Sequence, residues 1–261
     1  MAAVLASCCG RNANKKAAKD AAKAEKEAAV EEQKNVVTIF DGKTFDGWRG
    51  YNRETMPSKW TIEDGCIKFN GSGTGEGQSN DGGDIIFATP FTNFKLTFDW
   101  KVAKGSNSGV FFYAKELPGE PIYISSPEYQ ILDNANHPDA LLGKDGNRMS
   151  ASLYDMLPAK PQNAKPFGEW NTGGIMVYKG TVVHYQNEEA VVEYHLWTPE
   201  WTALINASKF AEGNPHWSNS FTLLTTQLGK DAEGNLVGGY IGLQDHGDDV
   251  WFRNIKVEIM D

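Results

Sequence analysis

The sequence has few cysteines and no long apolar run. Only Cys66 of its three cysteines falls in the part expected to fold, so a disulfide framework is excluded there. No stretch of 18 or more apolar residues is present, so no membrane-spanning helix is predicted. The net charge of -9 and the lack of a basic cluster in the main domain argue against nucleic-acid binding.

Two further patterns are missing. Strands and helices do not alternate in the manner of a parallel sheet, and no close ligand spacing such as His-x-x-x-His occurs. Side chains with suitable ligand atoms are scattered, at Glu128, Asp133, His184 and His246. The acidic turn at 245–249 could hold Ca²⁺ but has no EF-hand pattern. We therefore predict neither a metal nor a cofactor.

The N-terminus resembles an export signal. Residues 1–9 combine a short apolar run with small residues, and residues 5–8 read Leu-Ala-Ser-Cys, like a bacterial lipobox whose Cys8 becomes lipidated. The charged region that normally precedes such a run is missing, so either the true start lies upstream, which we favour, or the match is chance. Residues 10–35, rich in Ala, Lys and Glu, predict a helical or disordered spacer. We expect a lipid-anchored protein of the bacterial cell envelope, periplasmic or on the outer-membrane surface.

Residues 36–261 predict one all-β domain. Thirteen Phe, nine Tyr and eight Trp accompany 27 Gly, which indicates short strands and many turns. Residues 94–102 alternate between apolar and polar side chains, as expected of a half-buried antiparallel strand. About a dozen such segments favour a sandwich of two antiparallel sheets. Aromatic, acidic and amide side chains together suit a sugar ligand.

The C-terminal stretch predicts a closing β-hairpin. Residues 240–246 and 250–259 form its strands around a turn at 247–249. Alternation places Gln244 and His246 on one face, and Arg253 interrupts the apolar run of the second strand. Such polar groups are costly to bury unless their face meets water or a ligand.

Two longer segments lie between the strands. Residues 134–165 are polar, contain several prolines and exceed an ordinary connection, so we expect a loop that flanks a binding site. Residues 199–210 predict the only helix of the domain, with Thr198 as its cap and Pro199 at its first position.

Six motifs in order resemble the 3-keto-disaccharide hydrolase family. They are Phe-Asp-Gly-Trp at 45–48, Ser-Asn-Ser-Gly at 106–109, Glu-Tyr-Gln-Ile-Leu-Asp at 128–133, Gly-Glu-Trp-Asn at 168–171, His-Tyr-Gln-Asn at 184–187, and Gly-Leu-Gln-Asp-His at 242–246 together with Phe-Arg-Asn-Ile at 252–255. The resemblance implies a concanavalin-A-like jelly roll and cleavage of glycosides already oxidised to a ketone at sugar C3. Tyr113 departs from the family, which often has Arg there, so substrate specificity could differ.

A 3-keto sugar allows a route that avoids an oxocarbenium ion. The ketone acidifies the C2 proton, a base removes it, the C1 substituent leaves, and water adds back, which needs a base, an enolate stabiliser and an acid. Our catalytic candidates are Glu128 or His184 as the base and Arg253 as the group that binds the ketone oxygen. His184 could instead be a packed residue. Arg253 could instead pair with Glu128, or form an ion pair that only stiffens the sheet.

Further polar and aromatic residues are expected to bind the substrate. They are Asn107, Gln130, Asp133, Trp170, Gln244 and His246. Glu128 and Gln130 share a strand face about 7 Å apart, whereas Asp133 joins them only if a bulge shifts its phase. Trp170 and Tyr113 could stack on a sugar ring, although Trp170 could instead lie in the core, and His246 could be structural.

Two rival functions use the same surface. A noncatalytic carbohydrate-binding domain needs the curved face but no base. A retaining glucanase needs two carboxylates, and Gln130 stands where its Glu-x-Asp-x-x-Glu signature has Asp. The enzyme hypothesis requires that Glu128, His184, Gln244 and Arg253 converge on one hollow.

Overall fold

The computed structural model describes residues 35–71, 81–217 and 219–261. Val37–Asp261 form one compact unit. The predicted lipid-anchor residue Cys8, and the predicted spacer up to residue 34, lie outside the described residues. No helix in the described ranges is long and apolar enough to span a bilayer.

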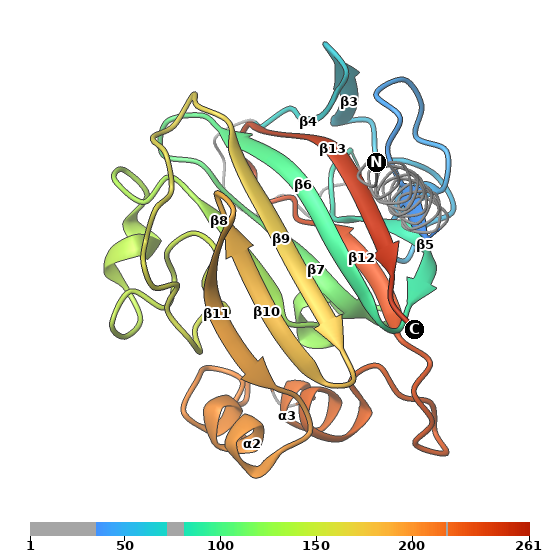
Figure 1. The fold of residues 1–261 in the computed structure, drawn as a ribbon, viewed down its shortest axis with the longest axis vertical. Coiled ribbons are helices and arrows are strands. Elements are labelled where there is room, and N and C mark those ends of the chain that lie inside the picture. Colours follow the sequence, from blue (N-terminus) through green and yellow to red (C-terminus); the bar gives the residue numbers. More distant parts are fainter. Residues whose placement is uncertain (1–34, 72–80, 218) are drawn as a thin grey trace, which may run out of the picture. The chain divides into compact units, whose positions relative to one another are not determined.

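Two antiparallel sheets form this unit, which confirms the predicted jelly-roll sandwich (Figure 1). The larger sheet has the order β11-β10-β9-β6-β13-β4-β3, with β1 also paired to β13, and the smaller has the order β2-β5-β12-β7-β8. The strands are β1 (Val36–Thr38), β2 (Trp48–Gly50), β3 (Trp60–Glu63), β4 (Cys66–Phe69), β5 (Ile85–Phe91), β6 (Phe94–Val102), β7 (Asn107–Ala114), β8 (Glu128–Leu132), β9 (Asn171–Tyr178), β10 (Thr181–Gln186), β11 (Glu189–His195), β12 (Gly239–Leu243) and β13 (Val250–Ile259).

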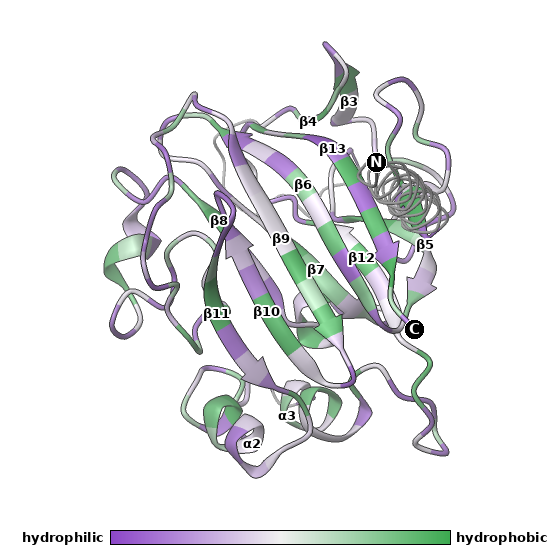
Figure 2. Ribbon diagram, in the orientation of Figure 1, coloured by the Kyte–Doolittle hydropathy of each residue, from purple (hydrophilic) through white to green (hydrophobic). Residues whose placement is uncertain are grey.

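The core lies between the two sheets. In β6 the apolar residues alternate inward, with Phe94, Leu96 and Trp100 each fully buried, and the banding of β6 and β13 is visible in Figure 2. The smaller sheet meets them with Phe112 and Tyr129. Because successive strand side chains point to opposite faces, the neighbours of these inward residues on β7 and β8 point away from the larger sheet.

The predicted closing hairpin is wrong in one respect. The strands β12 and β13 form close to where the sequence predicts them, yet β12 lies in the smaller sheet and β13 in the larger. Gly247, with φ of 86°, lies in the corner by which the chain crosses the sandwich. The two strands therefore do not pair, and their polar side chains point to opposite sides of the molecule.

The helical segments lie between strands. The predicted helix forms as α2 (Pro199–Asn206), where the Thr198 hydroxyl accepts the Trp201 N–H at 3.1 Å. It is not the only helix, because α3 (Ser220–Thr222) and η3 (Leu223–Gln227) follow. Two single turns, η1 (Ile122–Ile124) and η2 (Pro138–Leu141), precede and follow β8.

Candidate active site

A small hollow lies on the outward face of the smaller sheet. Its lining combines five of the predicted site residues with five that the sequence did not indicate. The predicted ones are Asn107, Glu128, Gln130, Gln244 and His246, and the others are Tyr123, Tyr154, Lys209, Phe210 and Trp217. Strands β7 and β8 and the end of β12 thus bring together amide, imidazole and carboxylate groups from three distant segments. Of the four residues that the enzyme hypothesis placed in one hollow, Glu128 and Gln244 are there, whereas His184 and Arg253 are not.

Glu128 supplies a carboxylate to this hollow. Its side chain is 6% exposed and lies across β7 against Gly109, where any Cβ would overlap the carboxylate. Gly109 therefore makes room for Glu128 to lie flat on the sheet. Glu128 is the one carboxylate among the described residues that line the hollow.

Two buried amide oxygens at this site lack a partner. Asn107 is 3% exposed and Gln244 is 7% exposed, and neither Asn107 Oδ1 nor Gln244 Oε1 has a hydrogen-bond partner among the described residues. Leaving a buried acceptor unpaired costs about 1–3 kcal/mol. Donors of a bound molecule, such as sugar hydroxyls, would satisfy both oxygens.

Lys209 is the main functional candidate that the sequence did not reveal. Its Nζ donates to the Tyr154 hydroxyl at 3.1 Å and lies 4.2 Å from the Tyr154 ring centroid and 4.5 Å from that of Trp217. Burial lowers the pKa of Lys209, although the nearby Glu128 carboxylate opposes that shift. The ammonium group is thus held among aromatic rings beside a carboxylate, with a proton that is easier to lose than that of a lysine in water.

A charged network fixes Lys209 in place. Arg148 donates to Asp155 at 2.6 Å and to Asp139 at 2.9 Å, and Asp155 accepts the backbone N–H of Lys209 at 2.8 Å. The Tyr154 hydroxyl donates to Asp139 at 2.9 Å, while burial raises the pKa of Tyr154 far above its usual value. Arg148, Tyr154 and both aspartates belong to the 134–165 segment, so this long loop does flank the hollow as predicted.

Aromatic rings form one wall of the hollow. The Tyr123 and Trp217 ring centroids are 4.9 Å apart, and the Phe210 ring meets Trp217 edge-on at 5.1 Å. Such rings have large, flat apolar faces, on which the C–H groups of a sugar ring can pack. The only sequence signal for this wall is the aromatic content of the segment that follows α2.

At the His246 end of the hollow, three residues could hold a metal ion. His137, His246 and Asp248 each offer one ligand atom, and these atoms all lie within 4.8 Å of one another. The prediction of no metal depended on spacing along the chain, and these residues come from two separate loops.

His184 does not reach the hollow. It is fully buried between the sheets, where Nδ1 donates to the Ala151 carbonyl at 2.9 Å and Nε2 accepts from the Tyr194 hydroxyl at 3.3 Å. Burial lowers the pKa of His184 to about 4. The expectation that it joins Glu128 is wrong, because its face of β10 points into the core and not to a ligand.

Arg253 and Trp170 lie on the outward face of the larger sheet. Arg253 donates to Asp99 at 3.1 Å and its guanidinium lies 3.9 Å from the Trp170 ring centroid. The thickness of the sandwich separates them from Gln244, because β13 crosses to the other sheet. The predicted pairing of Arg253 with Glu128 is wrong for this reason.

Asp133 also faces away from the hollow. Its carboxylate accepts the N–H of Gly105 at 2.8 Å and the Asn136 amide at 2.7 Å, and it is 3% exposed. No phase shift brings it beside Glu128, so it organises the turn after β8.

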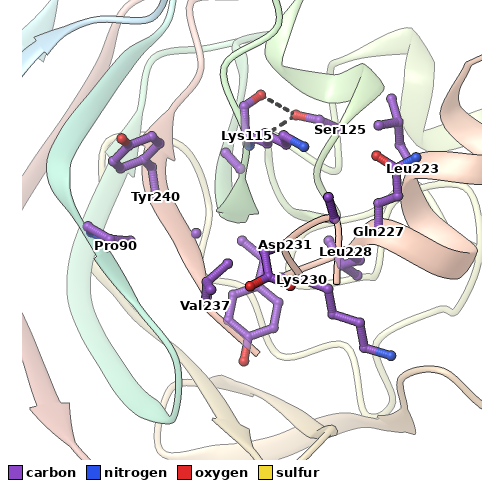
Figure 3. Close-up of a pocket in the computed structure, with 16 residues that line it drawn as sticks. Pro90, Lys115, Ser125, Leu223, Gln227, Leu228, Lys230, Asp231, Val237 and Tyr240 are labelled. Carbon is purple, nitrogen blue, oxygen red and sulfur yellow. Dashed lines mark hydrogen bonds between the residues drawn. The ribbon is translucent and has the colours of Figure 1, made fainter. Parts of the chain in front are cut away.

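A second hollow, drawn in Figure 3, lies at another end of the smaller sheet. Tyr113 lines it instead of the candidate site, and its hydroxyl donates to the Thr92 carbonyl. Lys115 and Ser125 line it too and bond to each other, with the Ser125 hydroxyl donating to the Lys115 carbonyl at 2.8 Å. Tyr113 is therefore not placed to stack on a sugar in the Glu128 hollow.

Comparison with known proteins indicates the same family as the six sequence motifs. Residues 35–258 match a family described as the 3-keto-alpha-glucoside-1,2-lyase-like domain. The chain is 64% identical over 234 residues to a Bacteroides thetaiotaomicron protein named 3-keto-disaccharide hydrolase, with 86% of this chain and 78% of that protein covered. Two crystal structures of putative glycosyl hydrolases from Parabacteroides distasonis are each 26% identical. They superpose with TM-scores of 0.69 and 0.59 and cover 88% and 86% of this chain, and 96% and 99% of their own.

Proposed function

The chain belongs to the family of the 3-keto-alpha-glucoside-1,2-lyase-like domain, and we propose that it cleaves 3-keto-glycosides in the hollow that Glu128 and Lys209 share. The observation that carries this proposal is the pair itself. A buried carboxylate and a half-buried amine, whose pKa is lowered by desolvation, line one aromatic-walled hollow. A binding module needs neither of these groups in such surroundings.

The proposed reaction begins at the carbon next to the ketone. Glu128 removes the C2 proton, and the electron pair of the C2–H bond becomes the enolate of the C3 ketone. The enolate then expels the C1 oxygen substituent, which takes a proton from the Lys209 ammonium and leaves as an alcohol. The products of this half are the free aglycone and an enone with a C1–C2 double bond.

Water completes the reaction. It adds to C1 of the enone while a proton returns to C2, which gives a free 3-keto sugar. Lys209, neutral after the first half, takes a proton from the adding water. The Glu128 carboxyl exchanges its proton with water once the aglycone has left, and it then returns a proton to C2. The sum is the addition of one water across the glycosidic bond, with both side chains restored.

The neighbouring amides have a binding role in this scheme. Asn107 Oδ1 and Gln244 Oε1 are unpaired acceptors that suit the hydroxyls of the keto sugar. Tyr123 and Trp217 would cover an apolar face of the ring. A mixed lining of this kind is typical of a sugar site.

A retaining glucanase is less compatible with the geometry. That mechanism needs two carboxyl groups about 5–5.5 Å apart across the glycosidic bond. Among the described residues that line the hollow, Glu128 is the one carboxylate, and Gln130 takes the place of the second. The keto route needs a single base, which the hollow has.

The test compares a chromogenic glucoside with its 3-keto form. Release of the chromophore from the keto form alone supports the proposal, and release from the intact glucoside supports a conventional glycosidase. Binding of either without release supports a noncatalytic module. The Glu193→Gln variant, which alters an exposed carboxylate on β11, is the control for substitutions at Glu128.

We also propose that the protein is tethered to the bacterial envelope through lipid on Cys8. The lipobox-like residues 5–8 and the Ala/Lys/Glu-rich residues 10–35 support this. In the native bacterium the wild-type protein should partition into detergent, and the Cys8→Ser variant should remain in the aqueous phase. Equal partitioning of the two proteins would reject the anchor without affecting the proposed chemistry.

A further inference from the structure

His137, His246 and Asp248 form a compact cluster at one end of the candidate hollow. One ligand atom from each lies within 4.8 Å of the other two. His137 precedes the η2 turn in the long loop, while His246 and Asp248 lie in the corner between β12 and β13. The fold therefore brings two imidazoles and a carboxylate together from loops more than 100 positions apart.

The cluster is held in place by Asn107, the first residue of β7. The Asn107 backbone N–H donates to Asp248 Oδ2 at 3.1 Å, and its side-chain nitrogen lies 3.2 Å from His246 Nε2. Both contacts fix the positions of the His246 ring and the Asp248 carboxylate. Asp248 offers a carboxylate oxygen to the cluster.

A second observation at the same place indicates a missing ligand. Asn107 is 3% exposed, and its Oδ1 has no hydrogen-bond partner among the described residues, although the other polar groups of the same residue contact His246 and Asp248. A metal-bound water, or the metal itself, would satisfy this oxygen. His246 and Asn107 also line the hollow, so the cluster and the candidate sugar site share residues.

We propose that His137, His246 and Asp248 bind one divalent first-row transition ion, such as Zn²⁺, Mn²⁺ or Co²⁺, at the edge of the hollow. Two imidazoles with one carboxylate suit these ions and leave coordination positions open, whereas Ca²⁺ and Mg²⁺ take mostly oxygen ligands. The His137 and His246 rings now make hydrogen bonds at 3.1 Å and 3.2 Å. Coordination replaces such neutral contacts at small cost, because each is worth about 1 kcal/mol.

The position suggests what the ion would do, and this step depends on the proposed function. An ion whose open positions face the hollow would bind the C3 ketone oxygen of a keto sugar as a Lewis acid. The carbonyl group would be polarised, and the C2 proton that Glu128 removes would become more acidic. The ion would then stabilise the enolate, the role that the sequence had assigned to Arg253.

The first test measures metal binding by the whole protein without substrate. After treatment with a chelator and dialysis, the wild type should bind one Co²⁺, with visible absorption typical of imidazole and carboxylate ligands. His137→Gln and Asp248→Asn should each weaken binding at least tenfold. His195→Gln, which alters an exposed histidine on β11, should bind like the wild type.

Circular dichroism and the melting temperature of each variant separate loss of a ligand from loss of the fold. Asp248→Asn is nearly isosteric, so it serves if the histidine variant does not fold. Equal Co²⁺ binding by the wild type and a folded Asp248→Asn variant would overturn the inference, as would no binding by the wild type. Zn²⁺ should raise the melting temperature of the wild type but not that of Asp248→Asn.

The same experiment distinguishes this inference from the proposed function. If the protein binds Co²⁺ at these residues but cleaves neither form of the glucoside, the metal site stands and the proposed function fails. If the metal-free wild type cleaves the keto form at the full rate and binds no Co²⁺, the function stands and the metal site fails.

Discussion

The Lys209 ammonium donates a hydrogen bond to the Tyr154 hydroxyl at 3.1 Å, and this contact joins the segment after α2 to the long 134–165 loop above the smaller sheet. Glu128 lines the same hollow from the sheet below. The two groups assigned to acid–base chemistry therefore come from different layers of the molecule and face the same hollow.

Removal of the Lys209 amine should slow cleavage of a 3-keto-glucoside. We expect Lys209→Met to lower kcat by about 10²–10⁴, because the departing C1 oxygen loses its proton donor. Steady-state kinetics with the chromogenic keto substrate measure the change. Lys256→Met, at an exposed position on the larger sheet, is the control and should keep the wild-type rate. A Lys209→Met enzyme with full kcat would remove Lys209 from the mechanism.

Replacement of Glu128 by Gln should abolish proton removal at C2 while the shape of the site is kept. We expect kcat to fall by about 10²–10⁴ with KM changed little, because the amide still fills the space over Gly109. If kcat persisted and KM alone rose, Glu128 would be a binding group and not the base.

Two tryptophans distinguish the candidate hollow from the outward face of the larger sheet. Trp217→Ala should raise KM for the keto-glucoside about tenfold, because a stacking ring contributes roughly 1 kcal/mol or more. Trp170→Ala should leave KM unchanged, because Trp170 packs against Arg253 on the other side of the sandwich. The reverse result would move the substrate site to that outer face.

His184 should make the fold sensitive to acid. In the unfolded chain His184 gains a proton near pH 6.5, whereas in the folded protein it stays neutral until the pH reaches about 4. The unfolded state therefore binds the extra proton first, and stability falls as the pH drops from 6.5 towards 4. The loss is at most about 3 kcal/mol for this residue.

Urea unfolding at several pH values tests this assignment. His184→Gln should be less stable than the wild type at pH 7.5, because the bonds to Ala151 and Tyr194 change. Its free energy of unfolding should then decline less between pH 6.5 and pH 4. An equal decline in the two proteins would show that His184 is not the group responsible, and His195→Gln, at an exposed site, should match the wild type.

The parts of the fold that depend on the local pattern of apolar, polar and capping residues could be predicted from the sequence. The strict alternation of residues 94–102 placed the inward face of β6 correctly, and the Thr198–Pro199 pair marked the start of α2. The alternation of side chains along a strand also predicted that Gln244 and His246 share a face. These features depend on neighbours in sequence, so a single chain is enough to reveal them.

The rest of the site depends on which sheet each strand joins. The alternation of side chains predicts which face of its strand each residue occupies. It does not predict that the face of His184 points into the core, or that the face of Arg253 lies on the far side of the sandwich. Lys209 had no local signal, because its setting is created by Tyr154 and Trp217 across the hollow. Long-range packing decides these placements.

The most direct test of the central claim follows the hydrogen at C2 of the substrate. A 3-keto-glucoside that carries deuterium at C2 is cleaved in ordinary water, and the sugar product is examined by mass spectrometry. The product should lose its deuterium in step with cleavage, and both cleavage and loss should be slowed to the same extent in the Glu128→Gln variant. A product that retains deuterium at C2 would show that the C1 bond breaks without proton removal and would contradict the account.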